Sequence, residues 1–316
     1  MLLNFALIFI GIALLVWSAD RFTDGASAFA RNLGVSPLIV GLTIVAIGSS
    51  APEIFVSVSA SLSGSSGLAV GNAIGSNIAN IALVLGVTAL IVPLQIESNV
   101  LRREFPVMFL VTFLAGFLLW DGYLSFIDGA VLIFCMFLYL FWMVHTAIKN
   151  HSNDRMLVEL VGELPDDMTN KRAALWIVVG LILLPLSSQI LVNGATGIAM
   201  HFGVSEFVIG LTIVALGTSL PELAASVASV LKGEHELAIG NVIGSNIFNL
   251  LAVLGVAGVI TPVAIDIDNI VREYSLMVFL TVVMFFMAYG FRGPARISRI
   301  EGGILTIIYA VFLFNQ

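Results

Sequence analysis

The feature that most constrains this 316-residue sequence is an internal duplication. One segment, residues 41–94, contains GLTIVAIGSSAPE and GNAIGSNIAN, and a second segment, residues 210–263, contains GLTIVALGTSLPE and GNVIGSNIFN. The segments align without a gap at a constant offset of 169 residues, which places Glu53 on Glu222. Both glutamates lie in long apolar stretches, where an ionised side chain is costly and usually functional. The duplication therefore predicts one shared central site built from both segments.

The composition is that of an integral membrane protein. Hydrophobic residues make up 59% and charged residues 10% of the chain, whereas about 25% of the residues of a soluble protein are charged. Continuous apolar runs of about 20 residues can cross a hydrocarbon core as helices, and they lack the alternation of a membrane barrel. We expect an all-α membrane protein with ten transmembrane helices and the lipid bilayer as its partner. The expected spans are 2–22, 36–62, 68–92, 105–120, 123–148, 173–193, 205–231, 237–261, 273–290 and 300–315.

The basic residues give an orientation. Of the 13 Lys and Arg residues, all but Arg272 fall on one side of the expected spans, and the positive-inside rule puts that side in the cytoplasm and both termini outside. Five crossings separate equivalent positions of the two segments, so the second segment enters the membrane in the opposite direction. Arg103 and Arg272 align at the 169 offset yet fall on opposite sides. Two inverted five-helix repeats around a midplane site are a recurring transporter architecture.

The same reading divides the chain into two repeats and a linker. Residues 1–149 form the first five-helix repeat, residues 150–171 a polar cytoplasmic linker, and residues 172–316 the second, inverted repeat. The single cysteine excludes an internal disulfide, and no basic tract indicates nucleic-acid binding. No cofactor and no protein partner are expected. Asp20 and Asp24 lie at an expected span end, where solvated or capping roles are the default.

Each repeat has a proline that interrupts an expected span. Pro52 and Pro221 lack a backbone donor and press against the carbonyls of Gly48 and Gly217, four residues earlier. In a bilayer, a carbonyl freed in this way must find a helix, a water or a cation as its partner. Hydroxyl residues flank the breaks at Ser49, Ser50, Thr218 and Ser219. The sequence thus gathers hard oxygen ligands around both glutamates.

The third and eighth spans add further oxygen ligands. Asn72, Ser76 and Asn80 recur every four residues and share one helix face. The second repeat places Asn241, Ser245 and Asn249 in the same way. Asn72 and Asn241 fit helix packing as well as direct ligation. Two carboxylates with hydroxyl, amide and carbonyl oxygens suit Ca²⁺ and can also hold Na⁺, whereas Zn²⁺ and copper favour His and Cys.

These duplicated motifs resemble the two alpha-repeats of the calcium/cation antiporter superfamily, and most of all the prokaryotic sodium/calcium exchangers. The resemblance implies a secondary active antiporter of the cell membrane that exchanges Na⁺ for Ca²⁺ by alternating access and exports Ca²⁺. Spans 1 and 6 would be the long, tilted pair that slides across the core.

The resemblance also implies a set of ion ligands. Glu53 and Glu222 would bind Ca²⁺ together with the backbone oxygens of Ser49 and Thr218. The Na⁺ sites would use the carbonyls of Ala46 and Ala215 and the side chains of Ser50, Ser76, Ser219 and Ser245, with Asn80 and Asn249 in the middle of the cluster.

The sequence departs from some of these exchangers at Asn249, where they carry an aspartate. The centre therefore has two formal carboxylates, which leaves H⁺ or K⁺ coupling open and keeps an H⁺/Ca²⁺ or K⁺-dependent Na⁺/Ca²⁺ antiporter of the same fold as the alternative. An intramembrane enzyme is disfavoured because no histidine lies in the repeat cores to form a metal-ligand pair or to serve as a base. A passive channel fits inverted repeats with broken helices less well than alternating access does.

Overall fold

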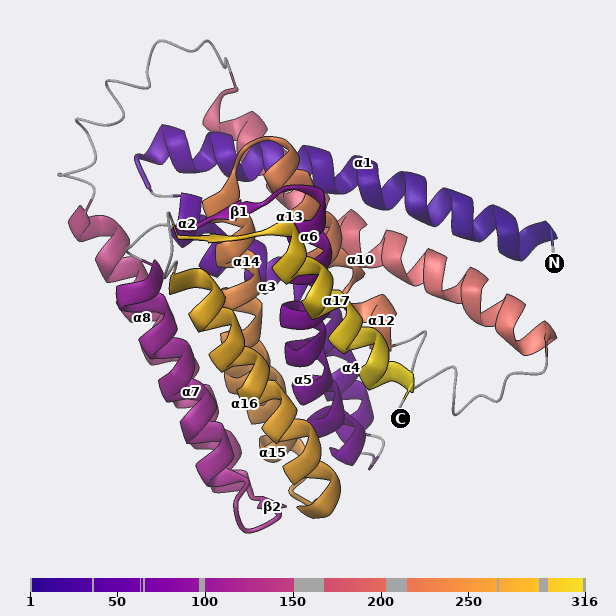
Figure 1. Ribbon diagram of the computed structural model, residues 1–316, viewed down its shortest axis with the longest axis vertical. Coiled ribbons are helices and arrows are strands. Elements are labelled where there is room, and N and C mark those ends of the chain that lie inside the picture. Colours follow the sequence, from indigo (N-terminus) through magenta and orange to yellow (C-terminus); the bar gives the residue numbers. More distant parts are fainter. Residues whose placement is uncertain are drawn as a thin grey trace.

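The computed structural model describes residues 2–35, 37–62, 64, 66–96, 100–150, 168–202, 215–265, 267–289 and 295–314. These residues form a helical bundle, shown in Figure 1, in which π-helical segments, labelled η, interrupt several α-helices. The first half contains α1 (Leu2–Leu33), α2 (Pro37–Val40), η1 (Gly41–Val45), α3 (Ala46–Ser49), α4 (Ala51–Leu62), α5 (Ser66–Ala79), η2 (Asn80–Leu85), α6 (Gly86–Ile91), η3 (Val100–Glu104), α7 (Phe105–Leu118) and α8 (Phe126–Asn150). The second half contains α10 (Asn170–His201), α12 (Ala215–Thr218), α13 (Leu220–Leu231), α14 (His235–Phe248), η5 (Asn249–Val253), α15 (Leu254–Ile260), α16 (Ile267–Tyr289) and α17 (Arg299–Phe314).

The described part of every expected span is mainly helical, although the span 123–148 begins with strand β2 and the span 105–120 ends two residues beyond α7. By length and composition alone, 6 of the described helices can cross a membrane, or up to 7 if the helix pair bent by 41° between Leu38–Ser49 and Ala51–Leu62 counts as one span. The first part of the expected span 205–231 and most of the linker lie outside the described residues. The boundaries of the two repeats and the linker therefore stay a prediction.

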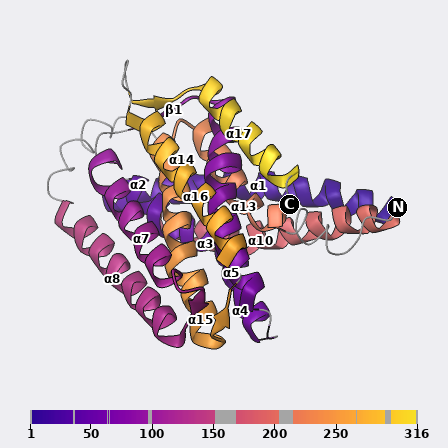
Figure 2. The same ribbon diagram turned by 60° about the horizontal axis from the view of Figure 1, so that its bottom comes forward.

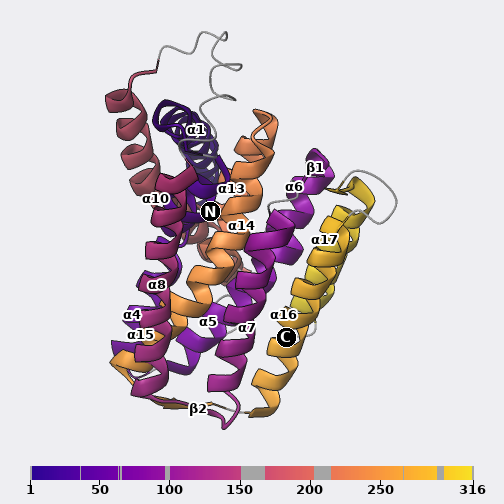
Figure 3. The same cartoon turned by 90° about the vertical axis from the view of Figure 1, so that its left-hand side faces the viewer.

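Two short β-ladders mark the two ends of the bundle. Strand β1 (Leu94–Gln95) pairs with β4 (Arg296–Ile297), and β2 (Tyr123–Leu124) pairs with β3 (Val263–Ala264), both antiparallel. Figures 1 and 3 show the first pair at one end of the bundle and the second pair at the other. Because β1 and β3 are 169 residues apart and lie at opposite ends, the ladders show directly that the second repeat is inverted.

Glycine contacts between α1 and α10 occur as a matched pair, as expected for two inverted repeats related by a two-fold axis. A Cβ added to Gly11 would lie 2.8 Å from Cβ of Leu191, and one added to Gly180 would lie 2.5 Å from Cβ of Phe22. Gly180 is the counterpart of Gly11, and Leu191 is the counterpart of Phe22, 169 residues apart in each case. The two long helices thus pack along each other through backbone-close contacts, and they run across the other helices in Figures 1 and 2.

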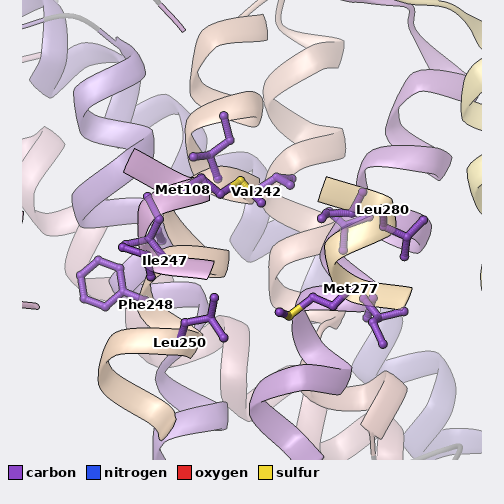
Figure 4. Close-up of a cluster of buried hydrophobic side chains, with 14 of the residues drawn as sticks. Met108, Val242, Ile247, Phe248, Leu250, Met277 and Leu280 are labelled. Carbon is purple, nitrogen blue, oxygen red and sulfur yellow. The ribbon is translucent and has the colours of Figure 1, made fainter. Parts of the chain in front are cut away.

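The centre of the bundle is formed by the third and eighth spans. Most of the apolar window is buried in Ala69–Ile91 (72%) and His235–Ile260 (83%), against 22% in Leu2–Leu33. Figure 4 shows part of the surrounding core, where Met108, Val242 and Met277 lie among other buried apolar side chains. Since lipid tails are as apolar as these side chains, close packing and interhelical hydrogen bonds stabilise the centre, more than the hydrophobic effect does.

We expect Gly302→Ala to lower the thermal unfolding midpoint in detergent and Gly303→Ala to leave it unchanged or slightly higher. A Cβ at Gly302 would lie 2.6 Å from the carbonyl oxygen of Gly86, whereas at Gly303 its nearest contact is Leu90 Cδ2 at 3.5 Å. Overpacking costs about 1–3 kcal/mol, while alanine is favoured over glycine within a helix by about 1 kcal/mol. Equal midpoints for the two variants would contradict the close packing of α17 on α6.

Candidate functional site

Both Pro-Glu segments break their helices as the sequence predicts. Helix α3 ends at Ser49, Ser50 has φ −83° and ψ 8°, and α4 begins at the next residue. Ser219 has φ −88° and ψ 1° and precedes α13 in the same manner. Each proline then lies in the first turn of a helix, where the missing N–H costs little. Each glutamate lies in that same first turn, where the helix dipole favours a negative charge.

The carbonyl freed by Pro221 has a protein partner. The hydroxyl of Ser188, which is buried on α10, donates a hydrogen bond to the oxygen of Gly217. The prediction that this oxygen needs a partner is thereby confirmed, and a neighbouring helix provides it. No pattern in the sequence pointed to Ser188, because its counterpart in the first repeat is Ala19.

Hydroxyl groups from both repeats surround Glu222. Its side chain is 0% exposed, and its Oε1 accepts a hydrogen bond of 2.8 Å from Ser50 Oγ and a longer one of 3.5 Å from Ser245 Oγ. Ser50 belongs to the first repeat, so the two halves meet at this carboxylate. Its other oxygen, Oε2, has no hydrogen-bond partner among the described residues.

The carboxylate of Glu53 is also 0% exposed, and neither of its oxygens has a hydrogen-bond partner in the part of the chain that the structure describes. It lies within electrostatic range of Glu222 and near the hydroxyls of Ser76 and Thr218. A buried carboxylate without a compensating partner is costly by several kcal/mol. The pair of acidic groups is therefore stable only when it is neutralised, either by a bound cation or by protonation.

Two carboxamides extend this set of unpaired oxygens. Asn80 and Asn249 are 0% exposed, and none of their side-chain atoms is hydrogen-bonded within the described ranges. Each begins a π-helical segment, a feature common at functional sites. Segment η2 packs on α13, which carries Glu222, and η5 packs on α4, which carries Glu53. Each amide thus lies on a segment that faces the glutamate helix of the other repeat.

The remaining predicted ligands differ in whether their oxygen atoms have hydrogen-bond partners. Ser219 is buried beside the second break, and its Oγ is unpaired among the described residues. Ser49 Oγ donates to Asn241 Oδ1 at 3.0 Å. The carbonyl of Ala46 accepts a hydrogen bond from Ser50 N at 3.0 Å. Ala215 begins α12, but its side chain lies outside what is described.

The donor set fits a hard cation. The described residues contain no group of three or more His, Cys, Asp or Glu side chains that could hold a metal, so the site offers two carboxylates supplemented by hydroxyl, amide and carbonyl oxygens. Ca²⁺ takes six to eight oxygen ligands in flexible geometry, and two carboxylates neutralise its charge. This set of oxygen atoms is suited to reversible cation binding inside a membrane bundle.

Comparison with known proteins agrees with this geometry. The family described as sodium/calcium exchanger protein matches residues 3–145 and 172–316. The chain belongs to this family. It is 49% identical to the putative antiporter CaxA of Alkalimonas amylolytica, with 100% of each chain covered, and 44% identical to the inner membrane protein YrbG of Escherichia coli (strain K12), with 99% of this chain and 96% of YrbG covered.

A solved exchanger has the same fold. The structure of the sodium-calcium exchanger NCX_Mj matches with a TM-score of 0.85 at 30% identity and covers 99% of each chain. The prediction of an all-α membrane fold with ten transmembrane helices in two inverted five-helix repeats is therefore confirmed.

The two sides of this exchanger site are packed differently. A cavity of about 390 Å³ lies between α4 and α10 and reaches Pro52 and Thr218 beside the site; its other lining residues are Ala51, Phe55, Val56, Pro185, Leu186, Ser188, Gln189 and Gly217. On the opposite side, α1 packs on α13 and buries Phe22 and Ala225 at 0% exposure. Since Ala225 is the counterpart of Val56, equivalent positions are open in one half and packed in the other.

An ionic cluster joins α1 to the end of α13 on the packed side. Lys232, just after α13, pairs with Asp20 at 2.6 Å and with Asp24 at 2.8 Å, both on α1. The expectation holds in part: the side chains are solvated, at 45% exposure for Asp20 and 31% for Asp24, but they cap no helix end, because α1 continues beyond them, and both pair with Lys232. Their counterparts on α10 are Gln189 and Asn193, which hydrogen-bond to each other at 2.9 Å. At these positions the charged contact between helices occurs only in the packed half.

A matched cysteine pair tests this asymmetry. In a Cys135→Ser background, we expect Val56→Cys to react with a small charged thiol reagent at least ten times faster than Ala225→Cys, because only Val56 lines the cavity. Reaction rates are measured on the purified protein in detergent, so both ends are accessible to the reagent. Similar rates at the two positions would show that the packing difference between the halves is absent in solution.

Proposed function

We propose that this chain is an antiporter that exchanges Na⁺ for Ca²⁺ by alternating access. The observation that carries the proposal is the pair Glu53 and Glu222, one from each inverted repeat, buried within electrostatic range of each other with unpaired oxygens. Membership of the sodium/calcium exchanger family supports antiport of a cation against Ca²⁺. The similarity to NCX_Mj, a sodium-calcium exchanger, favours Na⁺ as the counter-ion.

Competition for shared oxygens produces the exchange. Ca²⁺ would bind Glu53 and Glu222 with the backbone oxygens of Ser49 and Thr218. Na⁺ would use the same glutamates with the carbonyls of Ala46 and Ala215, the side chains of Ser50, Ser76, Ser219 and Ser245, and the central amides of Asn80 and Asn249. Because two bare carboxylates are costly inside the bilayer, the helices switch sides only when a cation of either kind neutralises the site.

The charge distribution sets the orientation of the proposed exchanger. Arg102, Arg103 and Arg296 belong to elements at the β1–β4 end, whereas Arg272 follows β3 at the other end. By the positive-inside rule, the β1–β4 end faces the cytoplasm and both termini lie outside. The α4 residues that line the cavity follow the helix break, and α4 runs from there to the β2–β3 end, where the oxygen of Ser61 accepts a hydrogen bond from Thr261. We therefore take the cavity as the access path from outside. Na⁺ entering from outside down its gradient and the membrane potential would drive Ca²⁺ export.

A proton-coupled or K⁺-dependent antiporter of the same fold is the alternative. The centre offers only two carboxylates, and the amides of Asn80 and Asn249 carry no charge that a proton could neutralise. The two glutamates could themselves take up protons, so the preference for Na⁺ as the coupling ion rests on the similarity to the sodium-calcium exchanger NCX_Mj. Uptake of Ca²⁺ driven in turn by a Na⁺, a K⁺ or a pH gradient distinguishes the candidates.

We expect Glu53→Gln and Glu222→Gln each to lower Na⁺-driven Ca²⁺ uptake into proteoliposomes at least a hundredfold, because a neutral amide cannot balance the charge of a divalent ion. Parent protein should take up Ca²⁺ when loaded with Na⁺ but not under a pH gradient alone. Glu104→Gln is the control, since Glu104 is also buried, at 5% exposure, but lies on η3 near the β1–β4 end. Parent-like uptake by either site variant would contradict the assignment of the carboxylates.

We expect Lys232→Met to loosen the packed side. Partly exposed ion pairs contribute about 1 kcal/mol or less each, so losing two of them should raise the thiol reactivity of Ala225→Cys by about three- to tenfold, and high salt should act in the same direction. Lys232→Arg retains the charge and should leave the reactivity low. Unchanged reactivity in Lys232→Met would remove the ionic cluster from the gating mechanism.

A further inference from the structure

We infer that Asn241 is a positioning residue that holds ion ligands of both repeats in register. The inference rests on the proposed function, because the ligands it positions are those of the proposed Ca²⁺ and Na⁺ site. The sequence left this residue open between helix packing and ligation, and the contacts of its side chain show how the two repeats are connected.

The carboxamide of Asn241 uses both its donor and its acceptor atoms. Its Nδ2 donates to the backbone oxygen of Glu222 at 3.2 Å and to Ser226 Oγ at 2.9 Å, and its Oδ1 accepts from Ser49 Oγ at 3.0 Å. The residue is 1% exposed. One side chain therefore joins a glutamate of the second repeat to a hydroxyl at the helix break of the first.

Two glycines on α14 make this reach possible. A Cβ on Gly240 would lie 2.6 Å from the carbonyl oxygen of Leu38, and one on Gly244 would lie 2.8 Å from that of Leu42. These contacts bring α14 against the first-repeat segment that leads to Ser49. Because the backbones touch, a side chain as short as asparagine spans the interface.

A substitution at this position cannot conserve all three contacts. An alanine removes the short bond of the Ser49 hydroxyl, which then keeps only contacts of 3.5 Å with the Ala46 oxygen and with Ser245 Oγ, and it removes the donor to Ser226. In the first repeat, Asn72 Nδ2 donates the equivalent bond to the backbone oxygen of Glu53 at 3.2 Å. The repeated bond indicates that each asparagine fixes the backbone of its own glutamate, and Asn241 adds the link between repeats.

The consequence for transport is a joint effect on both ions. Glu222 belongs to the Ca²⁺ site and to the Na⁺ sites, so misplacing it weakens both. Removing a proposed Na⁺ ligand that bonds to neither glutamate, such as the hydroxyl of Ser219, which has no partner among the described residues, is expected to change the Na⁺ dependence alone. A parallel loss of Ca²⁺ and Na⁺ affinity is therefore the signature of a positioning residue beneath a shared carboxylate.

Asn246 provides a matched control on the same helix. It is also 1% exposed, but its carboxamide has no hydrogen-bond partner among the described residues. In proteoliposomes, Asn241→Ala should raise the half-saturating concentrations of Ca²⁺ and Na⁺ at least tenfold each, with a smaller change in maximal rate. Asn246→Ala should change each of them less than twofold. The stabilisation of the purified protein by Ca²⁺, measured as a shift in unfolding midpoint, should fall in parallel for Asn241→Ala only.

A double-mutant cycle tests the link between repeats. If Asn241 acts through Ser49, then Ser49→Ala should weaken ion binding in the parent and add little in the Asn241→Ala background. The cycle of Ser49→Ala with Asn246→Ala should be additive. If Asn241→Ala does not fold, Asn241→Ser takes its place, since a serine side chain is too short to span the three partners.

The outcomes separate this inference from the proposed function. Half-saturating concentrations within twofold of the parent in Asn241→Ala overturn the inference, as does a lower unfolding midpoint with unchanged ion affinities. A parent protein that neither takes up Ca²⁺ under a Na⁺ gradient nor is stabilised by Ca²⁺ overturns the proposed function instead. Joint loss of both affinities with non-additivity towards Ser49→Ala supports the inference.

Discussion

Two acidic side chains that approach each other without access to water are the constraint on which this structure depends. Glu53 and Glu222 come from opposite repeats, and in a low-dielectric centre their repulsion and desolvation oppose the packing that brings them together. The helix dipole at each first turn and the Ser50 hydroxyl offset part of this cost. The remainder is left for a cation, so the same energy that destabilises the bare site provides the affinity for its cargo.

The two inverted repeats have closely matching backbone contacts, but a few of their equivalent side chains make different contacts. Glycine contacts between α1 and α10 match in this way, and so do the asparagine bonds to the two glutamate carbonyls. Ser50 bonds to Glu222, whereas Ser219, its counterpart, is unpaired among the described residues. A symmetric bundle would favour neither side. The ion pairs between Lys232 and α1 favour close packing on the α1–α13 side, whereas the cavity lies on the α4–α10 side.

Much of the fold and of the candidate site could be predicted from the duplication, because equivalent residues of the two repeats recur 169 positions apart. The ten spans, their inversion and the breaks at Pro52 and Pro221 all follow from local rules about apolar length, charge and missing donors. Ser57 and Ser226 could have been found in the same way, since they lie one turn after the glutamates and repeat at 169. The roles of Ser188 and Lys232 could not, because each depends on which helix packs opposite, and neither is repeated.

The neutral amides at Asn80 and Asn249 set the charge of the loaded site. In the proposed exchanger, one Ca²⁺ or two Na⁺ would balance the charge of the two carboxylates, so either cargo would cross the bilayer centre without a large electrostatic cost. A third Na⁺ would leave one positive charge in a low-dielectric region, where only the amide and hydroxyl oxygens could offset it. The unpaired carboxamides on η2 and η5 are suited to that task, because their oxygens bind a cation without adding a charge that would have to be neutralised on the return step.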